Sequence, residues 1–242
     1  MVSIITVFAF ESIGTATAMP VIAADLSLLE SYTWAFSAFI VASLFAMVAG
    51  GLWCGITGPR RPVIVGVIAL GIGSVVAGLA TGLVSLIVGR ALQGLGGGVI
   101  LVAVYVLIAR AYDVDARPKA FSVLSAAWVV PSLIGPLVAG WLAESVSWRA
   151  VFLIIPVVLL LPIALLIPRM RAFEGGTPGT PVRNRLLAGG VATVGLLAFQ
   201  AGVLQLSILG GVIAAIGLVA VIVGARFLLP GGALVFRRGL PT

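Results

Sequence analysis

Histidine is absent from this sequence, cysteine occurs once, and only 9% of the residues are charged. Histidine is the commonest metal ligand and general base, so we expect no metal site and no Ser-His-Asp hydrolase. The single cysteine, Cys54, excludes a disulfide framework within the chain. Soluble domains carry about 25% charged residues. The scarcity of charge, together with 62% hydrophobic residues, therefore indicates an integral membrane protein.

Acidic residues are scarce as well, with 7 against 14 lysines and arginines. The resulting formal charge of +7 does not predict a nucleic-acid partner, because the basic residues flank apolar runs and do not line one face. The apolar runs contain no G-x-S-x-G, no P-loop and no paired carboxylates. We therefore expect neither an enzyme nor a bound cofactor.

Eight apolar runs are long enough to cross a bilayer as helices, for which about 20 residues suffice. They cover 2–23, 32–54, 62–80, 85–109, 119–142, 150–167, 186–204 and 206–228. Of the 14 basic residues, 12 lie in the connections on one side, which predicts that this side and both termini are cytoplasmic. The predicted fold class is an all-α, polytopic membrane protein of the inner (plasma) membrane, with the lipid bilayer as its solvent.

Composition also predicts the domain organisation. Residues 1–167 form a six-helix bundle, and 168–185 form a basic, Gly- and Pro-rich cytoplasmic linker. Two additional helices occupy 186–228, and 229–242 form a cytoplasmic tail that leads toward helices beyond this sequence.

An internal echo predicts two three-helix repeats inside the bundle. Gly51 precedes Arg60 by nine residues, and Gly140 precedes Arg149 by nine residues, 89 positions later. An odd number of spans separates the two copies, so they face opposite sides of the membrane. Inverted repeats of this kind are typical of secondary transporters.

Two ionisable residues, Glu11 and Arg90, lie inside apolar runs. Such residues normally face a helix bundle or a water-filled cavity. One interpretation is structural: a buried ion pair, or separate hydrogen bonds to backbone. The other is functional: Glu11 exchanges protons with a water-filled cavity while Arg90 tunes its pKa. Their estimated depths of about 20 Å and about 8 Å, at ~1.5 Å per helical residue, leave direct pairing open.

Other residues of the fourth run, and aromatic residues elsewhere, are candidates for packing and for a substrate cavity. Gln93 and Gly97 lie on the Arg90 face of the helix, whereas Gly94 and Gly98 form a small-xxx-small seam for close packing. Tyr105 in this run and Trp128 in the next are candidates for a substrate-cavity wall, although core packing or contact with lipid explains them equally well. Trp34, Trp53, Trp141 and Trp148 fall near span ends, as an interfacial belt predicts.

Prolines interrupt the fifth run at Pro131 and Pro136. Gly135, Ala139 and Gly140 leave room for a neighbouring helix to press against the bend. The run is either an ordinary kinked helix or a gate between moving halves. Side-chain amides are scarce throughout the chain, which favours an apolar or amphiphilic cargo over a sugar.

Several motifs in order give the chain a resemblance to a known family. They are FESIGTATAMP with Glu11, LIVGRALQGLGGG with Arg90 and Gln93, PSLIGPLVAG with Gly135 and Pro136, and SWRAVFLIIP with Trp148 and Arg149. The sequence resembles the major facilitator superfamily, and within it the fourteen-helix drug:proton antiporters, over essentially its whole length. The two runs after the linker match the extra helix pair of that group.

The resemblance implies alternating access of an N-terminal bundle against a C-terminal bundle that is missing here and is required for a full cycle. It implies proton coupling by Glu11 and Arg90, and a role of Gly135 with Pro136 in the direction of antiport. From their positions in the apolar runs, Gln93, Tyr105 and Trp128 are candidate substrate-cavity residues, and Pro131 and Gly140 are candidate gating residues together with Gly135 and Pro136. The loop motif GLWCGITGPRRP adds Gly51, Gly58, Arg60 and Arg61 to the gating set. One departure stands out: Gly55 and Ile56 replace the charged pair that the family has in this loop.

Three functions remain open. In the first, the chain belongs to a proton-coupled antiporter that exports small hydrophobic or amphiphilic compounds, such as a multidrug efflux protein. Alternatively it belongs to a lipid or glycolipid exporter of the same fold, or it is a non-transporting membrane fragment or subunit.

Overall fold

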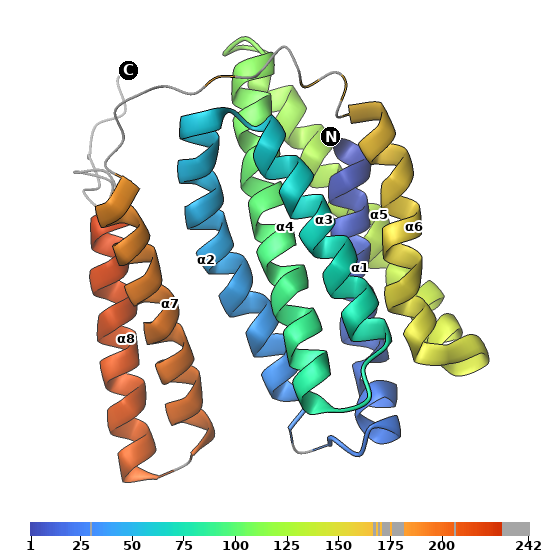
Figure 1. Ribbon diagram of the computed structural model, residues 1–242, viewed down its shortest axis with the longest axis vertical. Helices are drawn as coiled ribbons and strands as arrows, with labels where there is room; N and C mark the ends of the chain where they lie inside the picture. The colour runs from blue at the N-terminus through green and yellow to red at the C-terminus, as the bar shows by residue number, and fades with distance from the viewer. Residues whose placement is uncertain are drawn as a thin grey trace, which may run out of the picture. The chain divides into compact units, whose positions relative to one another are not determined.

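The computed structural model describes residues 1–29, 31–166, 168, 170, 175, 182–205 and 207–228, with the backbone alone at 182–185 and 204. These residues form eight α-helices and no strand, which confirms the all-α class (Figure 1). Each helix overlaps one predicted span. The helices are α1 (Val2–Asp25), α2 (Thr33–Thr57), α3 (Arg60–Gly78), α4 (Leu83–Ala111), α5 (Arg117–Leu142), α6 (Trp148–Leu166), α7 (Val182–Leu204) and α8 (Ile208–Leu228).

The connection between α5 and α6 differs from the prediction of a short loop there. A π-helical segment, η1 (Ala143–Ser147), joins the two helices directly. By length and composition the described helices are able to cross a membrane, and the helical run from Arg117 to Leu166 counts as one candidate. The polar residues around Glu144 resembled a loop in the sequence, yet they remain helical because η1 keeps their backbone groups within the helical hydrogen-bond pattern.

The chain divides into two compact units, Met1–Thr180 and Pro181–Thr242. The first contains α1–α6 and the second contains α7 and α8. Most of the predicted linker 168–185, and all of the predicted tail 229–242, lie outside the described residues.

Within the first unit, the packing follows an inverted repeat of α1–α3 and α4–α6. Helix α2 packs on α4 as α5 packs on α1, and α3 packs on α4 as α6 packs on α1. Helix α3 also packs on α6, its counterpart (Figure 1). The leading helix of each repeat therefore packs against the other repeat.

Glycines let α4 approach its neighbours at backbone distance. A Cβ added at Gly94 or Gly98 would overlap backbone carbonyls of Phe39 and Ser43 on α2, which confirms the predicted seam. A Cβ added at Gly96 would likewise overlap the backbone carbonyl of Gly66 on α3. Two glycine faces on one helix explain how α4 packs against both α2 and α3.

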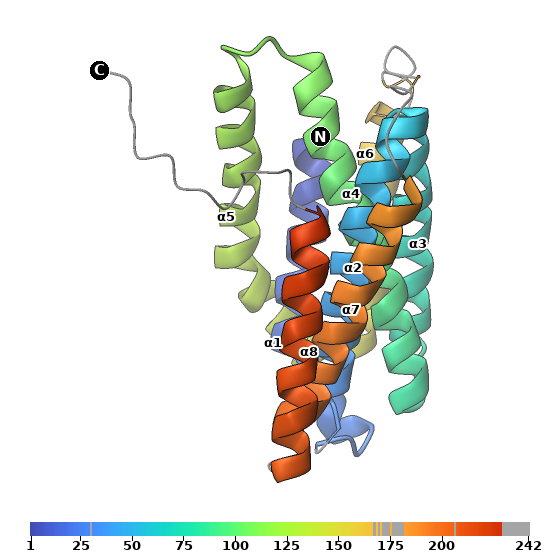
Figure 2. The ribbon, with the colours of Figure 1, turned by 90° about the vertical axis from the view of Figure 1, so that its left-hand side faces the viewer.

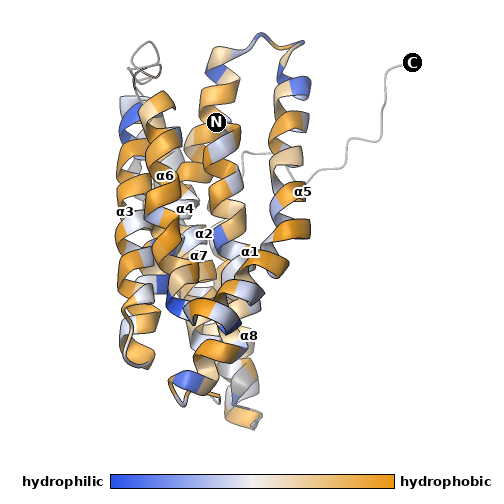
Figure 3. Cartoon of the chain, turned by 90° about the vertical axis from the view of Figure 1, so that its right-hand side faces the viewer, coloured by the Kyte–Doolittle hydropathy of each residue, from blue (hydrophilic) through white to orange (hydrophobic). Residues whose placement is uncertain are grey.

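The core of the first unit has three layers along the helices. One apolar cluster gathers residues such as Ile4, Leu70 and Leu107. A second cluster gathers residues such as Met19 and Phe152 toward the opposite end. Between them lie the buried polar side chains Glu11, Thr15, Ser74, Arg90 and Gln93. Outer surfaces are mostly hydrophobic, and hydrophilic residues gather at the turn between α4 and α5 (Figure 3).

The second unit is an antiparallel hairpin of α7 and α8 that run side by side in both views (Figures 1 and 2). Its seam, here called the glycine seam, consists of Ala188, Gly195 and Gly202 on α7 and Gly210, Gly217 and Gly224 on α8. A Cβ at Gly195 would lie 2.7 Å from the Gly217 oxygen, and one at Gly224 would lie 2.7 Å from the Ala188 oxygen. A spacing of seven residues keeps these positions on one face of each helix.

Candidate functional site

The two ionisable residues singled out from the sequence form a direct ion pair at the centre of the first unit. Arg90 Nη1 on α4 donates to Glu11 Oε1 on α1, across 79 residues of sequence. Both residues are only 1% exposed. Of the arrangements that the sequence left open, the structure has the buried ion pair.

A polar network surrounds this pair. Arg90 Nη1 also donates to Gln93 Oε1 at 2.9 Å, and Gln93 Nε2 donates to Ser74 Oγ on α3 at 3.0 Å. Thr15 Oγ1 donates to Glu11 Oε1 at 3.4 Å. The guanidinium carbon of Arg90 lies 4.2 Å from the centroid of the Phe39 ring on α2, a cation–π contact. Four helices thus supply the surroundings of one guanidinium.

Two atoms of the pair keep spare hydrogen-bonding capacity. Among the described residues, Glu11 Oε2 and Arg90 Nε are buried without a hydrogen-bond partner. An unsatisfied buried polar atom costs about 1–3 kcal/mol, so such atoms are rare in protein interiors. Oε2 is therefore an atom that can take a proton while Oε1 keeps its contact with Arg90.

The pair does not face water in this conformation, contrary to the expectation of a water-filled cavity beside it. The reason is its place between the two apolar clusters, with the Phe39 ring against the guanidinium. Gly97, expected on the Arg90 face, allows the Phe8 ring of α1 to pack where a Cβ would overlap it. Close packing of α1, α2 and α4 thus accompanies the almost complete burial of both side chains.

The predicted cavity residues separate in the structure. Gln93 is fully buried within the polar network. Tyr105 is 44% exposed and meets the Phe121 ring edge to face at 5.5 Å. Trp128 is half-buried and meets the Phe8 ring in the same way at 5.8 Å. The structure does not bring these three residues together.

The small residues of α5 face α1, as expected for a neighbour pressed against the proline segment. A Cβ at Gly135 would lie 3.6 Å from Ile13, and the Ala139 side chain would lie 3.3 Å from a Cβ at Gly14. Gly140 lies near Thr17 of α1. Both prolines, Pro131 and Pro136, lie inside an uninterrupted α5.

Pro131 and Gly135 also border an apolar cavity of about 300 Å³ between α1, α5 and α6. The α1 residues of its wall are Thr6, Val7 and Phe10, and Glu11 follows directly along the helix. Neither member of the ion pair lines this cavity, and the Glu11 carboxylate accepts its hydrogen bonds from Arg90 and Thr15 within the polar network.

The loop motif after α2 adopts a tight turn. Gly58 ends α2 with φ 81°, a conformation that favours glycine, and Arg60 begins α3. Gly51 packs near Val102 of α4, and Arg61 is exposed. Where the family has a charged pair, Gly55 is half-buried and Ile56 is 52% exposed. Instead, Arg110 of α4 donates to the Cys54 carbonyl at 3.3 Å and thereby holds the end of α2.

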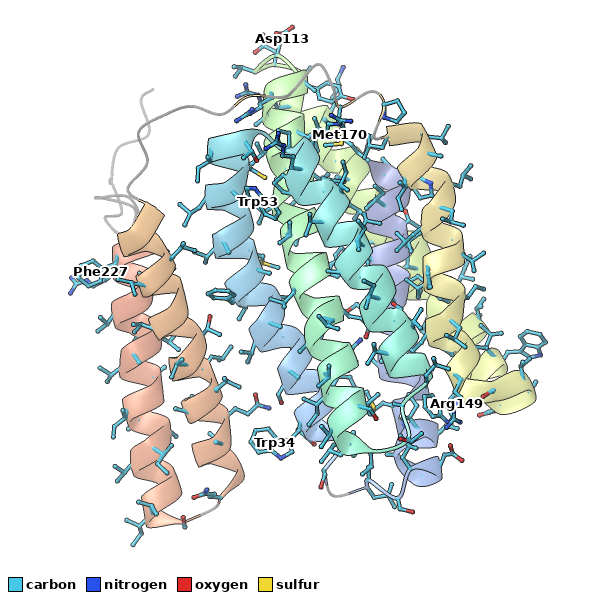
Figure 4. All side chains as sticks on the ribbon, in the orientation of Figure 1. Trp34, Trp53, Asp113, Arg149, Met170 and Phe227 are labelled. Atoms are coloured by element: carbon cyan, nitrogen blue, oxygen red, sulfur yellow. The ribbon has the colours of Figure 1, made fainter. Side chains whose placement is uncertain are left out.

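A second polar cluster, which sequence reasoning missed, lies where α6 begins, at the end of the unit opposite Asp113 (Figure 4). Trp148 Nε1 donates to Asp25 Oδ2 at 2.8 Å, and Arg149 Nη1 donates to the same oxygen at 3.3 Å. Arg149 also donates to the Ala80 carbonyl at 3.3 Å. Trp148 is buried, so it is not part of an interfacial belt as predicted.

No group of three or more acidic, cysteine or histidine side chains gathers to hold a metal ion within the described part of the chain. What the fold and site define is a polytopic helical membrane protein, built from inverted three-helix repeats around a buried ion pair. The sequence profile of the Major Facilitator Superfamily matches residues 1–240. The chain belongs to this family of membrane transporters.

Individual relatives are similar to parts of the chain. An uncharacterized MFS-type transporter of Mycobacterium tuberculosis is 30% identical over 185 residues, which cover 74% of this chain and 26% of the relative. In Bacillus subtilis, Multidrug transporter protein MdtP is 31% identical over 153 residues (63% and 28%). Multidrug resistance protein 3 is 32% identical over 150 residues (62% and 29%). The matched region is thus less than a third of each relative.

Proposed function

We propose that the chain is part of a proton-coupled antiporter that exports small hydrophobic or amphiphilic compounds by alternating access. The buried Glu11–Arg90 pair carries the proposal, because a membrane-embedded carboxylate paired with arginine marks a proton or ion pathway. The names of the two Bacillus relatives support export of multiple drugs. Net proton movement requires that Glu11 bind and release a proton once in each cycle.

Proton exchange needs a second conformation, because Glu11 is only 1% exposed here. We propose that α1 moves away from α4, which opens the pair to water on one side of the membrane at a time. The unpartnered Oε2 is where the proton binds. A second helical bundle opposite α1 and α4 completes the cycle in this proposal, in an inner membrane with both termini of this chain on the cytoplasmic side.

The test is transport by the full natural chain in proteoliposomes, with ethidium as the amphiphilic probe and an imposed pH gradient as the driving force. In Glu11→Gln, we expect gradient-driven transport to be lost while ethidium exchange without a gradient persists, because the variant binds cargo but carries no proton. Glu144→Gln is the matched control, since Glu144 is exposed on η1. Gradient-driven transport that survives in Glu11→Gln would contradict proton coupling through this residue.

One observation favours the lipid-exporter alternative. The wall of the cavity between α1, α5 and α6 is apolar apart from Thr6, and a hydrocarbon chain fits such a surface. The same proteoliposomes, assayed with a fluorescent phospholipid in place of ethidium, discriminate between the two cargoes. Movement of the lipid without movement of ethidium would favour the alternative.

A further inference from the structure

We propose that Ser74 is a positioning residue for Arg90, and that it acts by fixing which end of the Gln93 amide faces the guanidinium. Ser74 lies on α3, is fully buried and does not touch Arg90 itself. The proposal rests on the function proposed above only for its consequence in transport. Its structural part stands on the hydrogen bonds alone.

The direction of each hydrogen bond gives Ser74 this role. A hydroxyl has one proton to donate, and Ser74 Oγ donates it to the Leu70 carbonyl at 2.9 Å. Only its lone pairs therefore face Gln93, so the Gln93 NH₂ group must point toward Ser74. The amide oxygen is then the atom presented to Arg90 Nη1, at 2.9 Å.

Close packing of α3 on α4 makes this contact possible. A Cβ at Gly73 would lie 2.6 Å from the Gln93 backbone nitrogen and 2.8 Å from the Gly89 oxygen. The glycine before Ser74 thus lets the two backbones touch, so that a side chain as short as serine reaches the Gln93 amide.

The consequence is that Arg90 keeps one acceptor when its partner changes. If Glu11 takes up a proton or moves with α1, the Gln93 oxygen still accepts from Nη1, and the Phe39 ring still covers the guanidinium. Arg90 therefore stays with α2, α3 and α4, and Glu11 is the partner that leaves. Without the Ser74 hydroxyl, the amide is free to turn its NH₂ group toward a cation.

Two variants of closely similar shape isolate the hydroxyl. Ser74→Thr and Ser74→Val both add a branched side chain, but only threonine keeps the acceptor. The experiment treats the purified full chain with phenylglyoxal, an arginine reagent, and quantifies labelling of Arg90 by mass spectrometry. We expect Arg90 in Ser74→Val to be labelled about tenfold faster than in Ser74→Thr, the ratio typical of losing one buried hydrogen bond.

Labelling of Arg149 is the internal reference for a folded chain, because it lies in the separate cluster with Asp25. Ser43→Ala is the matched control, since Ser43 is buried on α2 and donates to the Ile40 carbonyl of its own helix. We expect it to leave Arg90 protected. Equal labelling of Arg90 in the threonine and valine variants, with Arg149 unchanged in both, would overturn the positioning role.

Transport separates this proposal from the proposed function. We expect Ser74→Val to lower gradient-driven ethidium transport about tenfold relative to Ser74→Thr, by the same loss of one buried hydrogen bond. If Glu11→Gln leaves transport intact while the labelling difference holds, the coupling proposal fails and the positioning role stands. If labelling is equal while Glu11→Gln abolishes coupling, the reverse is true.

Discussion

The two units of this chain hold their helices together in different ways. In α1–α6, buried polar side chains form a layer between two apolar clusters. In α7 and α8, every buried residue that the structure describes is glycine or alanine, and the helices meet backbone to backbone along the glycine seam. Small residues promote such close packing in membranes without help from ionised groups.

The comparison bears on why the ion pair exists. Helices of this chain pack closely without burying a charge, so packing alone does not require Glu11 and Arg90 to be inside. A buried ion pair is weak evidence for stability, because removing two charges from water costs several kcal/mol per ion. Stability is therefore a weak explanation for the pair, which the first unit contains and the described part of the second does not.

The largest expected effect breaks the polar layer. Arg90→Met removes the cation and leaves Glu11 buried without its partner, which we expect to cost about 3–5 kcal/mol of unfolding free energy. The measurement is thermal unfolding of the purified chain in detergent. The double variant Glu11→Leu with Arg90→Met is the control and should recover much of the loss. A double variant as unstable as the single one would mean that the pair itself holds the bundle together.

The next effect breaks the glycine seam. In Gly217→Leu the new side chain meets the backbone of Phe199 and Gly195, and overpacking of this kind costs about 1–3 kcal/mol or more. We expect faster hydrogen exchange throughout α7 and α8. Gly211→Leu is the matched control, because nothing lies within 4 Å of a Cβ there. Similar exchange in both variants would remove the seam as the source of cohesion.

A smaller effect sharpens the comparison inside the first unit. Gly73→Ala places a methyl group against the Gln93 backbone, and we expect it to lower stability by about 1–3 kcal/mol in thermal unfolding. Gly71→Ala, on the same helix, meets only Pro156 at 3.8 Å and should be neutral or slightly stabilising, because alanine favours helix. The opposite ranking would contradict the close approach of α3 to α4.

The smallest effect concerns the cluster at the start of α6. Asp25→Asn keeps an oxygen for the Trp148 indole but loses the ion pair with Arg149. The side chains of Arg149 and Asp25 are 38% and 50% exposed. We expect a small loss of stability that shrinks as salt is added, because water and ions screen an exposed pair. Asp115→Asn, an exposed position between α4 and α5, serves as the control. A loss independent of salt would point to the hydrogen bonds and away from the charge.

The sequence predicted the helices well, because runs of apolar residues leave few alternatives in a membrane. It failed between α5 and α6, where Glu144 and Arg149 resembled a loop but the backbone stays helical. The number of residues from a helix end gives the depth along that helix, but different helices do not begin at the same depth. This is why depth estimates left the pairing of Glu11 with Arg90 open, although the two side chains meet.

The candidate site was only partly visible in the sequence. Ionised residues in apolar runs stand out, so Glu11, Arg90 and Gln93 were found. Ser74 and Thr15 were not, because a single hydroxyl in an apolar run usually bonds its own helix and carries no signal of a distant partner. The glycine seam was not predicted, although glycine recurs every seven residues at 210, 217 and 224, a spacing that could have indicated it. Trp148 shows that a residue near a span end need not face the membrane surface.

The first helix of each repeat packs against the other repeat, and this has a consequence for the order of assembly during biosynthesis. Among the six helices, α1 is translated first, but the helices it packs against, α5 and α6, are translated last. Its carboxyl group also has to wait for the arginine, which is 79 residues away. Helix α1 therefore lacks most of its packing partners until all six helices have been translated.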